Sequence, residues 1–568
     1  MRNNSSSRLY LLAGVFVLVG LMLVGKLFFI QIVAGAEYRE AAERQYRQSL
    51  GRTFNRGSIF LSSKDGTLVS GATLTTGYIL AINPPLLTEP QMVYDQLHQV
   101  LPNLDQEQFQ LKSQRRNDPY EEVAARLDES AAAGIRALKL PGVEIIEENY
   151  RSYPGQELAA QVLGFMGYQG NIYAGRYGLE KQYEEILRRQ GEVTFSTFLA
   201  ELLSGSIGGG RAASGVSGDL ITTIEPKVQQ FLESELETVM TKWQGRAAGG
   251  IILEPRTGAV LALAARPAFD PGEKQGDLSV LLNPLVERVY EMGSIVKPLT
   301  LAAGLDAGAV NEDTYYTDLG SVIISDKVIS NYDGRARGRV PLQEILNQSL
   351  NTGAVFVMQQ LGQERFRHYF DAFGLGQKTG IDLPGEVRGL VSNLETGSEV
   401  EYATAAFGQG LAVTPLNITM ALSTLANGGQ LLRPRVVERI RYTTGVSEEL
   451  PPPPGRQVIK VETARRLTTM LVKVVDEALD GGRARLPHYQ VAAKTGTAQI
   501  PRPDGQGYET DKFLHSFFGY FPATAPRFSV FLYTLEPTGA LYASQTLTEP
   551  FSQLAKFLLN YYQVPPDR

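Results

Sequence analysis

The sequence is organised around residues 290–300, which read Tyr290-Glu291-Met292-Gly293-Ser294-Ile295-Val296-Lys297-Pro298-Leu299-Thr300. The apolar residues after Ser294 predict a helix, and if Ser294 opens it, Lys297 lies one turn further along the same face. A hydroxyl at a helix start faces free backbone N–H groups, and a neighbouring amine can take its proton, as a serine nucleophile requires. A capping serine beside a solvated lysine has the same spacing. However, Ser294 is the only serine of the chain with a lysine three residues later.

A second candidate site lies in residues 347–353, which contain the only Ser-x-Asn sequence of the chain, Ser349 and Asn351. A hydroxyl and a carboxamide two residues apart can relay a proton and hold a substrate amide. Small polar residues between helices also serve as caps, so this pair carries weight only together with the other motifs.

The third candidate is a Lys-Thr-Gly sequence, which occurs twice. The copy at Lys378 stands between glycine-containing turns, which predict a loop. The second copy lies within residues 491–500, whose apolar flanks predict a strand. A substrate-binding strand needs a cation, hydroxyls for a carboxylate, and a glycine where a substrate backbone comes close. The second copy supplies all of these on a strand, as Lys494, Thr495, Gly496 and Thr497.

The composition excludes several classes of function. A length of 568 residues predicts two or three domains. The net charge of −6 leaves no basic excess to neutralise phosphates, so nucleic acid is not an expected partner. The chain has no cysteine, which excludes disulfides, thiolate metal sites and a cysteine nucleophile. Its four histidines show no ligand spacing, so they do not indicate a metal site.

The first 33 residues predict a membrane anchor. Residues 9–33 are almost entirely apolar, and about 25 residues at about 1.5 Å each exceed the roughly 30 Å hydrocarbon core. Arg2 and Arg8 favour a cytoplasmic tail at residues 1–8 and an extracytoplasmic remainder. A cleaved signal peptide is the alternative. However, the apolar run is longer than the about 7–15 apolar residues that are usual in a signal peptide.

The rest of the pattern predicts two domains, a pedestal at residues 34–215 and a larger domain at residues 216–568. The segment 203–217 is rich in glycine and serine and predicts the connector between them. An Asp-Gly turn at residues 65–66 predicts a strand pair near the start of the pedestal, and residues 89–140 are mostly helical in pattern. The larger domain is predicted to have strands at both ends and helices between, hence one mixed α/β domain whose sheet is closed by its termini. The expected elements are a hairpin at 250–263, strands at 489–500, 516–521 and 528–535, and a last helix at 549–562.

Taken in order, Ser-x-x-Lys, Ser-x-Asn and Lys-Thr-Gly resemble the signature of penicillin-binding proteins and serine β-lactamases. The flanking segments resemble class B penicillin-binding proteins, and within the class the division-specific members most closely. These segments are Arg56-Gly57-Ser58-Ile59, Arg151-Ser152-Tyr153-Pro154, Gly175-Arg176-Tyr177-Gly178-Leu179-Glu180, Thr379-Gly380-Ile381-Asp382-Leu383-Pro384-Gly385-Glu386, Phe407-Gly408-Gln409-Gly410 and Ala426-Asn427-Gly428-Gly429.

The resemblance implies an antiparallel sheet flanked by helices, carried on an elongated α+β pedestal of the dimerisation type. It also implies a peptidoglycan D,D-transpeptidase, in which Ser294 attacks the penultimate D-alanine of a stem peptide and Lys297 takes the serine proton. A second cation at Lys494 would lower the pKa of Lys297. The remaining implied roles are a proton relay for Ser349, substrate orientation for Asn351, carboxylate binding for Thr495 and Thr497, and an oxyanion hole from the backbone N–H groups of Ser294 and Thr497.

The implied partners are peptidoglycan stem peptides, β-lactams, the membrane, a multi-pass glycosyltransferase and division proteins. The implied location is the plasma or inner membrane, with one membrane pass and an extracytoplasmic catalytic domain. A β-lactamase or carboxypeptidase needs no pedestal, and a penicillin sensor needs a signalling domain larger than residues 1–8. An elongation-specific transpeptidase and an inactive division scaffold stay as alternatives.

Overall fold

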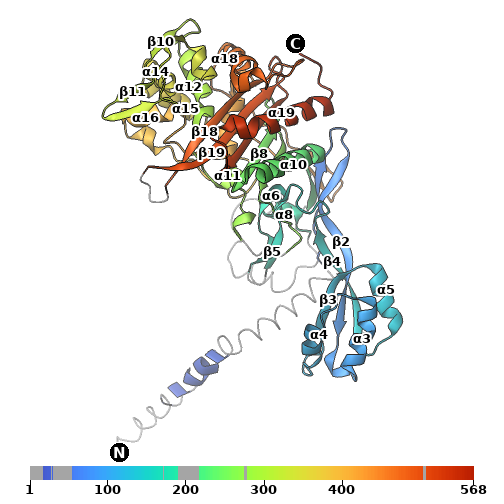
Figure 1. The fold of residues 1–568 in the computed structure, drawn as a ribbon. Coiled ribbons are helices and arrows are strands. Elements are labelled where there is room, and N and C mark those ends of the chain that lie inside the picture. The colour runs from blue at the N-terminus through green and yellow to red at the C-terminus, as the bar shows by residue number, and fades with distance from the viewer. Residues whose placement is uncertain are drawn as a thin grey trace, which may run out of the picture.

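The computed structural model describes residues 54–169, 172–189, 217–273, 278–502 and 507–568, together with helical residues between 14 and 29. A large C-terminal body continues into a narrower pedestal that ends in a small head (Figure 1). The chain mixes helices and strands throughout, as the sequence predicts.

A five-stranded antiparallel sheet forms the centre of the large body, in the order β18-β19-β20-β8-β9. The hairpin and the three C-terminal strands predicted from the sequence are confirmed. The two ends of the domain meet in the sheet, where the last strand β20 pairs with the first hairpin strand β8. Every residue of β20 is buried, which fits a strand covered on both faces. The strands are β8 (Ala247–Leu253), β9 (Val260–Arg266), β18 (Ala492–Pro501), β19 (Tyr508–Phe521) and β20 (Phe528–Leu535).

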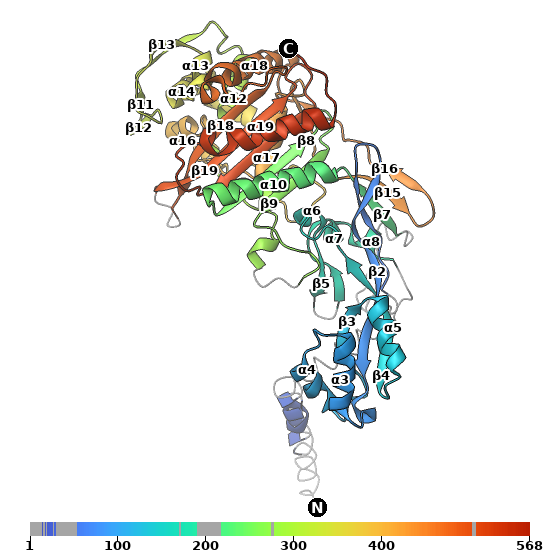
Figure 2. The ribbon, with the colours of Figure 1, turned by 45° about the vertical axis from the view of Figure 1, so that its right-hand side comes forward.

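Two long helices, α10 (Pro226–Trp243) and α19 (Ala543–Tyr561), cover one face of this sheet (Figure 2). The buried residues of α10 recur at helical spacing and pack on the strands, as in Val228, Leu232, Leu236 and Val239. The sequence predicts α19 from residue 549, but the helix begins six residues earlier. Its start is fixed by Gln545, whose Oε1 accepts hydrogen bonds from the backbone N–H groups of Leu541 and Tyr542, and tyrosine is not among the preferred N-cap residues.

The other face of the sheet carries the short 3-10 turn η4 (Gly293–Val296), which runs directly into α12 (Lys297–Asp306). Helices and small hairpins pack around this pair and form one large hydrophobic core with the sheet. The helices are α11 (Pro284–Glu287), α13 (Gln343–Asn347), α14 (Asn351–Leu361), α15 (Gln363–Ala372), α16 (Glu399–Ala405), α17 (Pro415–Ser423), α18 (Val461–Lys473) and the π-helical η6 (Val474–Ala478). The hairpin strands are β10 (Tyr315–Asp318), β11 (Ser321–Ile324), β12 (Lys327–Ser330) and β13 (Gly338–Pro341).

A second sheet, of seven strands, joins the pedestal to the large body. Its long strand β2 (Leu68–Ile82) pairs with β1 (Ile59–Ser62), and the predicted Asp-Gly strand pair is thereby confirmed. The strand predicted at the start of the larger domain exists as β7 (Gly218–Thr222), but it pairs with β1 and with β15 (Val437–Tyr442). Both halves of the chain therefore contribute strands to one sheet. The sheet also contains β16 (Ser447–Glu449).

The head of the pedestal packs three helices on β2, β3 (Glu121–Leu127) and β4 (Val143–Ser152). The helices predicted between residues 89 and 140 are present as α3 (Pro90–Val100), α4 (Gln106–Ser113) and α5 (Glu129–Leu138). The prediction misses β3, because four of its seven residues are glutamate, arginine or leucine in a segment rich in helix-forming residues. Pairing with β2 overrides that local preference.

A buried ionic cluster ties the pedestal segments together. The Glu180 side chain is fully buried in α7 (Gly178–Gln182) and accepts hydrogen bonds of 2.6 Å from Arg56 Nε and from Arg151 Nε. Burial by itself raises the pKa of the Glu180 carboxyl, but the charges of Arg151 and Arg56 hold it below its ordinary value. Three segments that are distant in the sequence therefore meet at one carboxylate.

Most of the predicted membrane segment 9–33, the tail 1–8 and nearly all of the connector 203–217 lie outside the described residues. Within the part of the chain that the structure describes, no helix is both long and apolar enough to cross a bilayer.

The ionic cluster leads to a prediction about stability. Glu180→Ala leaves two buried guanidinium groups without their carboxylate, so the free energy of unfolding should fall by about 3–5 kcal/mol. The measurement is urea-induced unfolding of the purified protein. The matched control is Glu549→Ala, which removes the exposed ion pair with Lys242 and should cost at most about 1 kcal/mol. Equal losses in the two variants would contradict a stabilising role for the cluster.

Candidate active site

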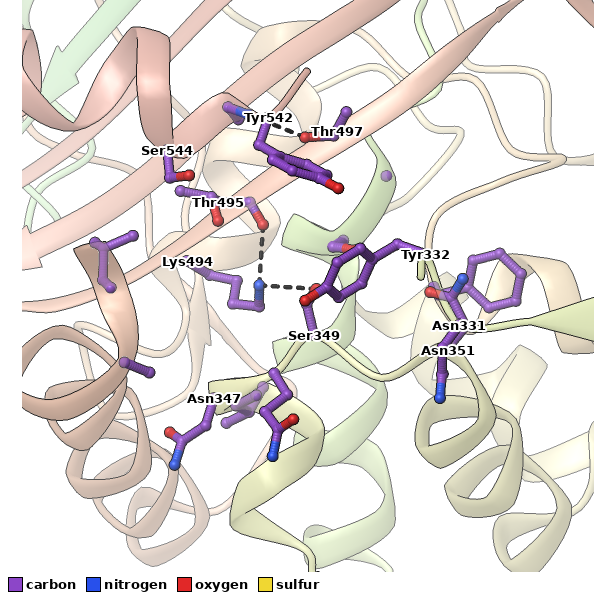
Figure 3. Close-up of a pocket in the computed structure, with 18 of the residues that line it drawn as sticks. Asn331, Tyr332, Asn347, Ser349, Asn351, Lys494, Thr495, Thr497, Tyr542 and Ser544 are labelled. Carbon is purple, nitrogen blue, oxygen red and sulfur yellow. Dashed lines mark hydrogen bonds between the residues drawn. The ribbon is translucent and has the colours of Figure 1, made fainter. Parts of the chain in front are cut away.

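A cavity of about 650 Å³ opens between β18, the turn η4, the start of α14 and the start of α19. Of the predicted site residues, Ser294, Ser349, Asn351, Lys494, Thr495 and Thr497 line it. Figure 3 shows the amine of Lys494 directed at Ser349 on the facing turn. The fold thus brings together three motifs that are separated by up to 200 residues in the sequence.

Ser294 stands on η4, which packs backbone to backbone against β18. Gly293 has a φ of +63°, and a Cβ there would lie 2.9 Å from the carbonyl oxygen of Thr497. A Cβ at Gly496 would lie 2.6 Å from the carbonyl oxygen of Met292. The two glycines therefore allow the close approach that places Ser294 beside the strand.

Gly496 is packed within the fold. A Cβ there would meet the hydroxyl of Ser516 and the backbone of Met292, so packing between η4 and β18 requires a glycine at this position. Gly496 is not among the residues that line the cavity, and its expected role in the approach of a substrate backbone stays a prediction.

Lys297 is fully buried, and its amine is directed at Ser349. Lys297 Nζ donates hydrogen bonds to the carbonyl oxygen of Ser349 and, at 3.2 Å, to Ser349 Oγ. Within the described part of the chain these are its hydrogen-bond partners, so the proton acceptor expected for Ser294 is in contact with Ser349. Burial lowers the pKa of Lys297 well below its ordinary value, and the charge of Lys494 lowers it further. The predicted direction is confirmed, with burial as the larger cause.

Lys494 donates to the same hydroxyl. Its Nζ donates to Ser349 Oγ at 3.1 Å and to the carbonyl oxygen of Thr495 at 3.1 Å (Figure 3). The side chain is 3% exposed, and burial lowers its pKa to about 7. Ser349 Oγ accepts from two amines, so both of its acceptor positions are occupied and its own proton is available for donation.

Asn351 lies at the first turn of α14, next to the hairpin β11–β12. Its Nδ2 donates to the carbonyl oxygen of Ser330 at 2.9 Å, which fixes the amide plane. Among the described residues nothing donates to the amide oxygen, which can therefore accept a hydrogen bond from a substrate. On the strand, Thr497 Oγ1 accepts a hydrogen bond of 3.1 Å from the backbone N–H of Ala543 at the start of α19 (Figure 3). The strand hydroxyls and the lysine amine form one polar wall of the cavity.

The other copy of Lys-Thr-Gly lies in a loop, as predicted. Gly380 has a φ of +78°, and the backbone N–H groups of Thr379 and Gly380 donate to the carboxylate of Glu386. The backbone of this copy is therefore hydrogen-bonded to Glu386, and its residues do not line the cavity.

Several residues outside the three motifs also line the cavity. Tyr332 and Tyr542 meet across it, with ring centroids 5.7 Å apart. They come from loops that carry no spacing pattern, so no signal in the sequence marks them. Phe407 and Gln409 belong to a segment that carries the family resemblance and could have been named. Further lining residues include Asn331, Asn347, Gln348, Leu479, Asp480 and Ser544. Within the described residues no three histidines or carboxylates converge as metal ligands.

Comparison with known proteins agrees with this geometry. The family model described as the penicillin binding protein transpeptidase domain matches residues 248–556, and the model of the penicillin-binding protein dimerisation domain matches residues 54–199. The chain belongs to the penicillin-binding protein transpeptidase family. Its combination of the two domains is that of the class B penicillin-binding proteins.

Three relatives illustrate the similarity. Stage V sporulation protein D of Bacillus subtilis is 32% identical, over 94% of this chain and 82% of its own length. Peptidoglycan D,D-transpeptidase FtsI of Escherichia coli is 26% identical, over 78% and 73% of the two chains. The crystal structure of penicillin binding protein 3 of Mycobacterium tuberculosis complexed with aztreonam is 27% identical, with a TM-score of 0.65 over 74% of this chain and 92% of that one.

Proposed function

We propose that this protein is a peptidoglycan D,D-transpeptidase that works through an acyl-enzyme on Ser294. The observation that carries the proposal is the position of Ser349 Oγ, 3.2 Å and 3.1 Å from two buried lysine amines, in the cavity that Ser294 lines. Buried amines with lowered pKa values can act as bases and proton carriers near neutral pH. Similarity to proteins named peptidoglycan D,D-transpeptidase supports the reaction.

The acylation step uses the residues as follows. Lys297, in its neutral form, takes the proton of Ser294 while Oγ attacks the carbonyl of the penultimate D-alanine. The backbone N–H groups of Ser294 and Thr497 stabilise the oxyanion. The Oγ–C bond forms, the C–N bond of the terminal D-alanine breaks, and Ser349 passes a proton from the lysine pair to the leaving amine.

Substrate binding falls to the polar wall of the cavity. Thr495 and Thr497 donate hydroxyl hydrogen bonds to the terminal carboxylate, which lies beside the Lys494 amine. The free amide oxygen of Asn351 accepts from a backbone N–H of the stem peptide. An amine of a neighbouring stem peptide then attacks the acyl-enzyme and forms the cross-link, with Ser294 recovering a proton.

The proposed cellular location is the cell membrane at the division septum. The chain acts in the cell membrane, anchored by residues 9–33 with the catalytic domain outside, and cross-links the septal wall during division. Relatives named FtsI support the septal role. A multi-pass glycosyltransferase, working with division proteins, supplies the glycan strands, because neither matched domain is a polymerase. The elongation-specific role is the alternative that shares the same chemistry.

A fluorescent penicillin tests the nucleophile. Penicillins mimic D-Ala-D-Ala, and a relative is known as an aztreonam complex, so the purified protein should become covalently labelled. Ser294→Ala should show no covalent label while keeping the thermal unfolding temperature of the parent. Label that persists on Ser294→Ala would disprove this assignment, and a folded parent without label would favour the inactive scaffold.

The lowered pKa of Lys297 predicts a pH dependence. The labelling rate should rise with pH as Lys297 loses its proton, because only the neutral amine can accept the proton of Ser294. Lys494→Gln removes the neighbouring charge, so the pKa of Lys297 should rise and the midpoint of the profile should move to higher pH. Lys378→Gln, in the loop copy of Lys-Thr-Gly, is the matched control and should keep the parent profile. A midpoint that stays fixed or moves to lower pH in Lys494→Gln would contradict this pairing.

The membrane and partner assignments are tested by in-cell crosslinking. Full-length protein should remain in the membrane fraction after an alkaline wash and should crosslink to a multi-pass membrane protein. A chain that begins at residue 34 behind an exported leader should lose both properties. A full-length protein that washes off the membrane would refute the anchor, and an anchored protein without such a crosslink would refute the partner.

A further inference from the structure

Asp318, at the end of β10, is a fully buried carboxylate outside the cavity. Its oxygens accept hydrogen bonds from Asn331 Nδ2 at 2.9 Å and from Thr352 Oγ1 at 2.7 Å. They also accept from the backbone N–H groups of Gly320 at 3.1 Å and Arg337 at 2.9 Å. All these partners are donors, and a carboxylate is an acceptor on both oxygens, so the match is complete.

One arm of this network reaches the residue after Asn351. Asn331 is 4% exposed, and its Oδ1 accepts a hydrogen bond of 3.2 Å from the backbone N–H of Thr352, whose hydroxyl donates to Asp318. Asn351 in turn donates to the carbonyl oxygen of Ser330, the residue before Asn331. Figure 3 shows Asn331 and Asn351 side by side at the edge of the cavity. The first turn of α14 is thus attached to the hairpin at two successive residues.

The other arm reaches the residue before Ser349. The backbone N–H of Arg337 donates to Asp318, and Arg337 Nε donates to Gln348 Oε1 at 2.9 Å. The Asp318 carboxylate therefore connects, through different neighbours, to both sides of the short segment 348–352.

That segment needs support because of its backbone. Ser349 has a φ of +56°, a left-handed conformation that is unfavourable for residues other than glycine and persists only where surrounding contacts hold it. The same residue presents its carbonyl oxygen to Lys297 and its hydroxyl to both lysine amines. A relaxed Ser349 backbone would turn the hydroxyl away from the amines.

We infer that Asp318, acting through Asn331, Arg337 and Thr352, is a positioning residue that holds Ser349 and Asn351 in their catalytic orientation. The inference rests on the proposed acylation of Ser294. Asp318 touches neither substrate nor reacting atoms, so its effect is on the rate of the chemical step.

The first test is Asp318→Asn, measured by stopped-flow acylation with a fluorescent penicillin. An asparagine turns one acceptor oxygen into a donor that faces other donors. The limiting acylation rate constant should fall about 10- to 100-fold, more than the dissociation constant of the initial complex rises. Asp326→Asn makes the same chemical change in the turn of the neighbouring hairpin β11–β12, at a carboxylate that is 79% exposed, and should keep the parent rate.

The second test guards against a variant that does not fold. Thr352→Val removes the hydroxyl that donates to Asp318, whereas Thr352→Ser keeps it. The valine variant should show the slow acylation and the serine variant should recover most of the parent rate, with both measured well below their unfolding temperatures. A purely structural role would lower the unfolding temperature of Thr352→Val without changing its acylation constants.

The outcomes separate this inference from the proposed function. If the parent protein is not acylated at Ser294, the proposed function fails. If the parent is acylated and folded Asp318→Asn or Thr352→Val reacts at the parent rate, the positioning role is refuted and the proposed function stands.

Discussion

Lys297 and Lys494 are both buried, and the amines of both donate hydrogen bonds to the hydroxyl of Ser349. The rest of the site depends on this arrangement. The fall in the pKa of Lys494 from 10.5 to about 7 corresponds to roughly 5 kcal/mol of unfavourable free energy when the amine is charged. An unfolded lysine keeps its ordinary pKa, so this cost is complete below pH 7 and disappears as pH rises towards 10.5. The folded protein must offset it by packing, which is what the large apolar core around η4 and α12 supplies.

Close backbone packing joins η4 to β18. Gly293 and Gly496 remove the two Cβ atoms that would separate η4 from β18, and Ser516 donates its hydroxyl to the carbonyl of Met292 across the same contact. Ser294, Lys297 and strand β18, to which the proposed function gives the nucleophile, its base and the carboxylate site, are therefore held in fixed positions relative to one another. Preorganisation of this kind is the main source of electrostatic catalysis in enzymes.

The pedestal is joined to the catalytic body by shared structure. β7 follows the connector in the sequence, yet it pairs with β1 of the pedestal on one side and with β15 on the other. Glu180, Arg56 and Arg151 form their cluster close to this junction, since Arg151 Nη1 also donates to the carbonyl of Gly57. The pedestal and the catalytic body are therefore connected by one continuous hydrogen-bonded sheet.

Local patterns in the sequence are sufficient to predict the elements whose signal is local. The hairpin at 250–263, the strand around Lys494 and the loop around Lys378 follow from apolar runs and turn residues, and the order of the three motifs indicates the chemistry. Tertiary structure decided the rest, because it depends on which distant segments meet. Only the fold shows that Glu180 lies between two arginines, that Gly496 faces Met292, that Lys297 contacts Ser349, and that Asp318 supports the turn at Ser349. These relations arise from burial and long-range pairing, which carry no fixed spacing along a chain.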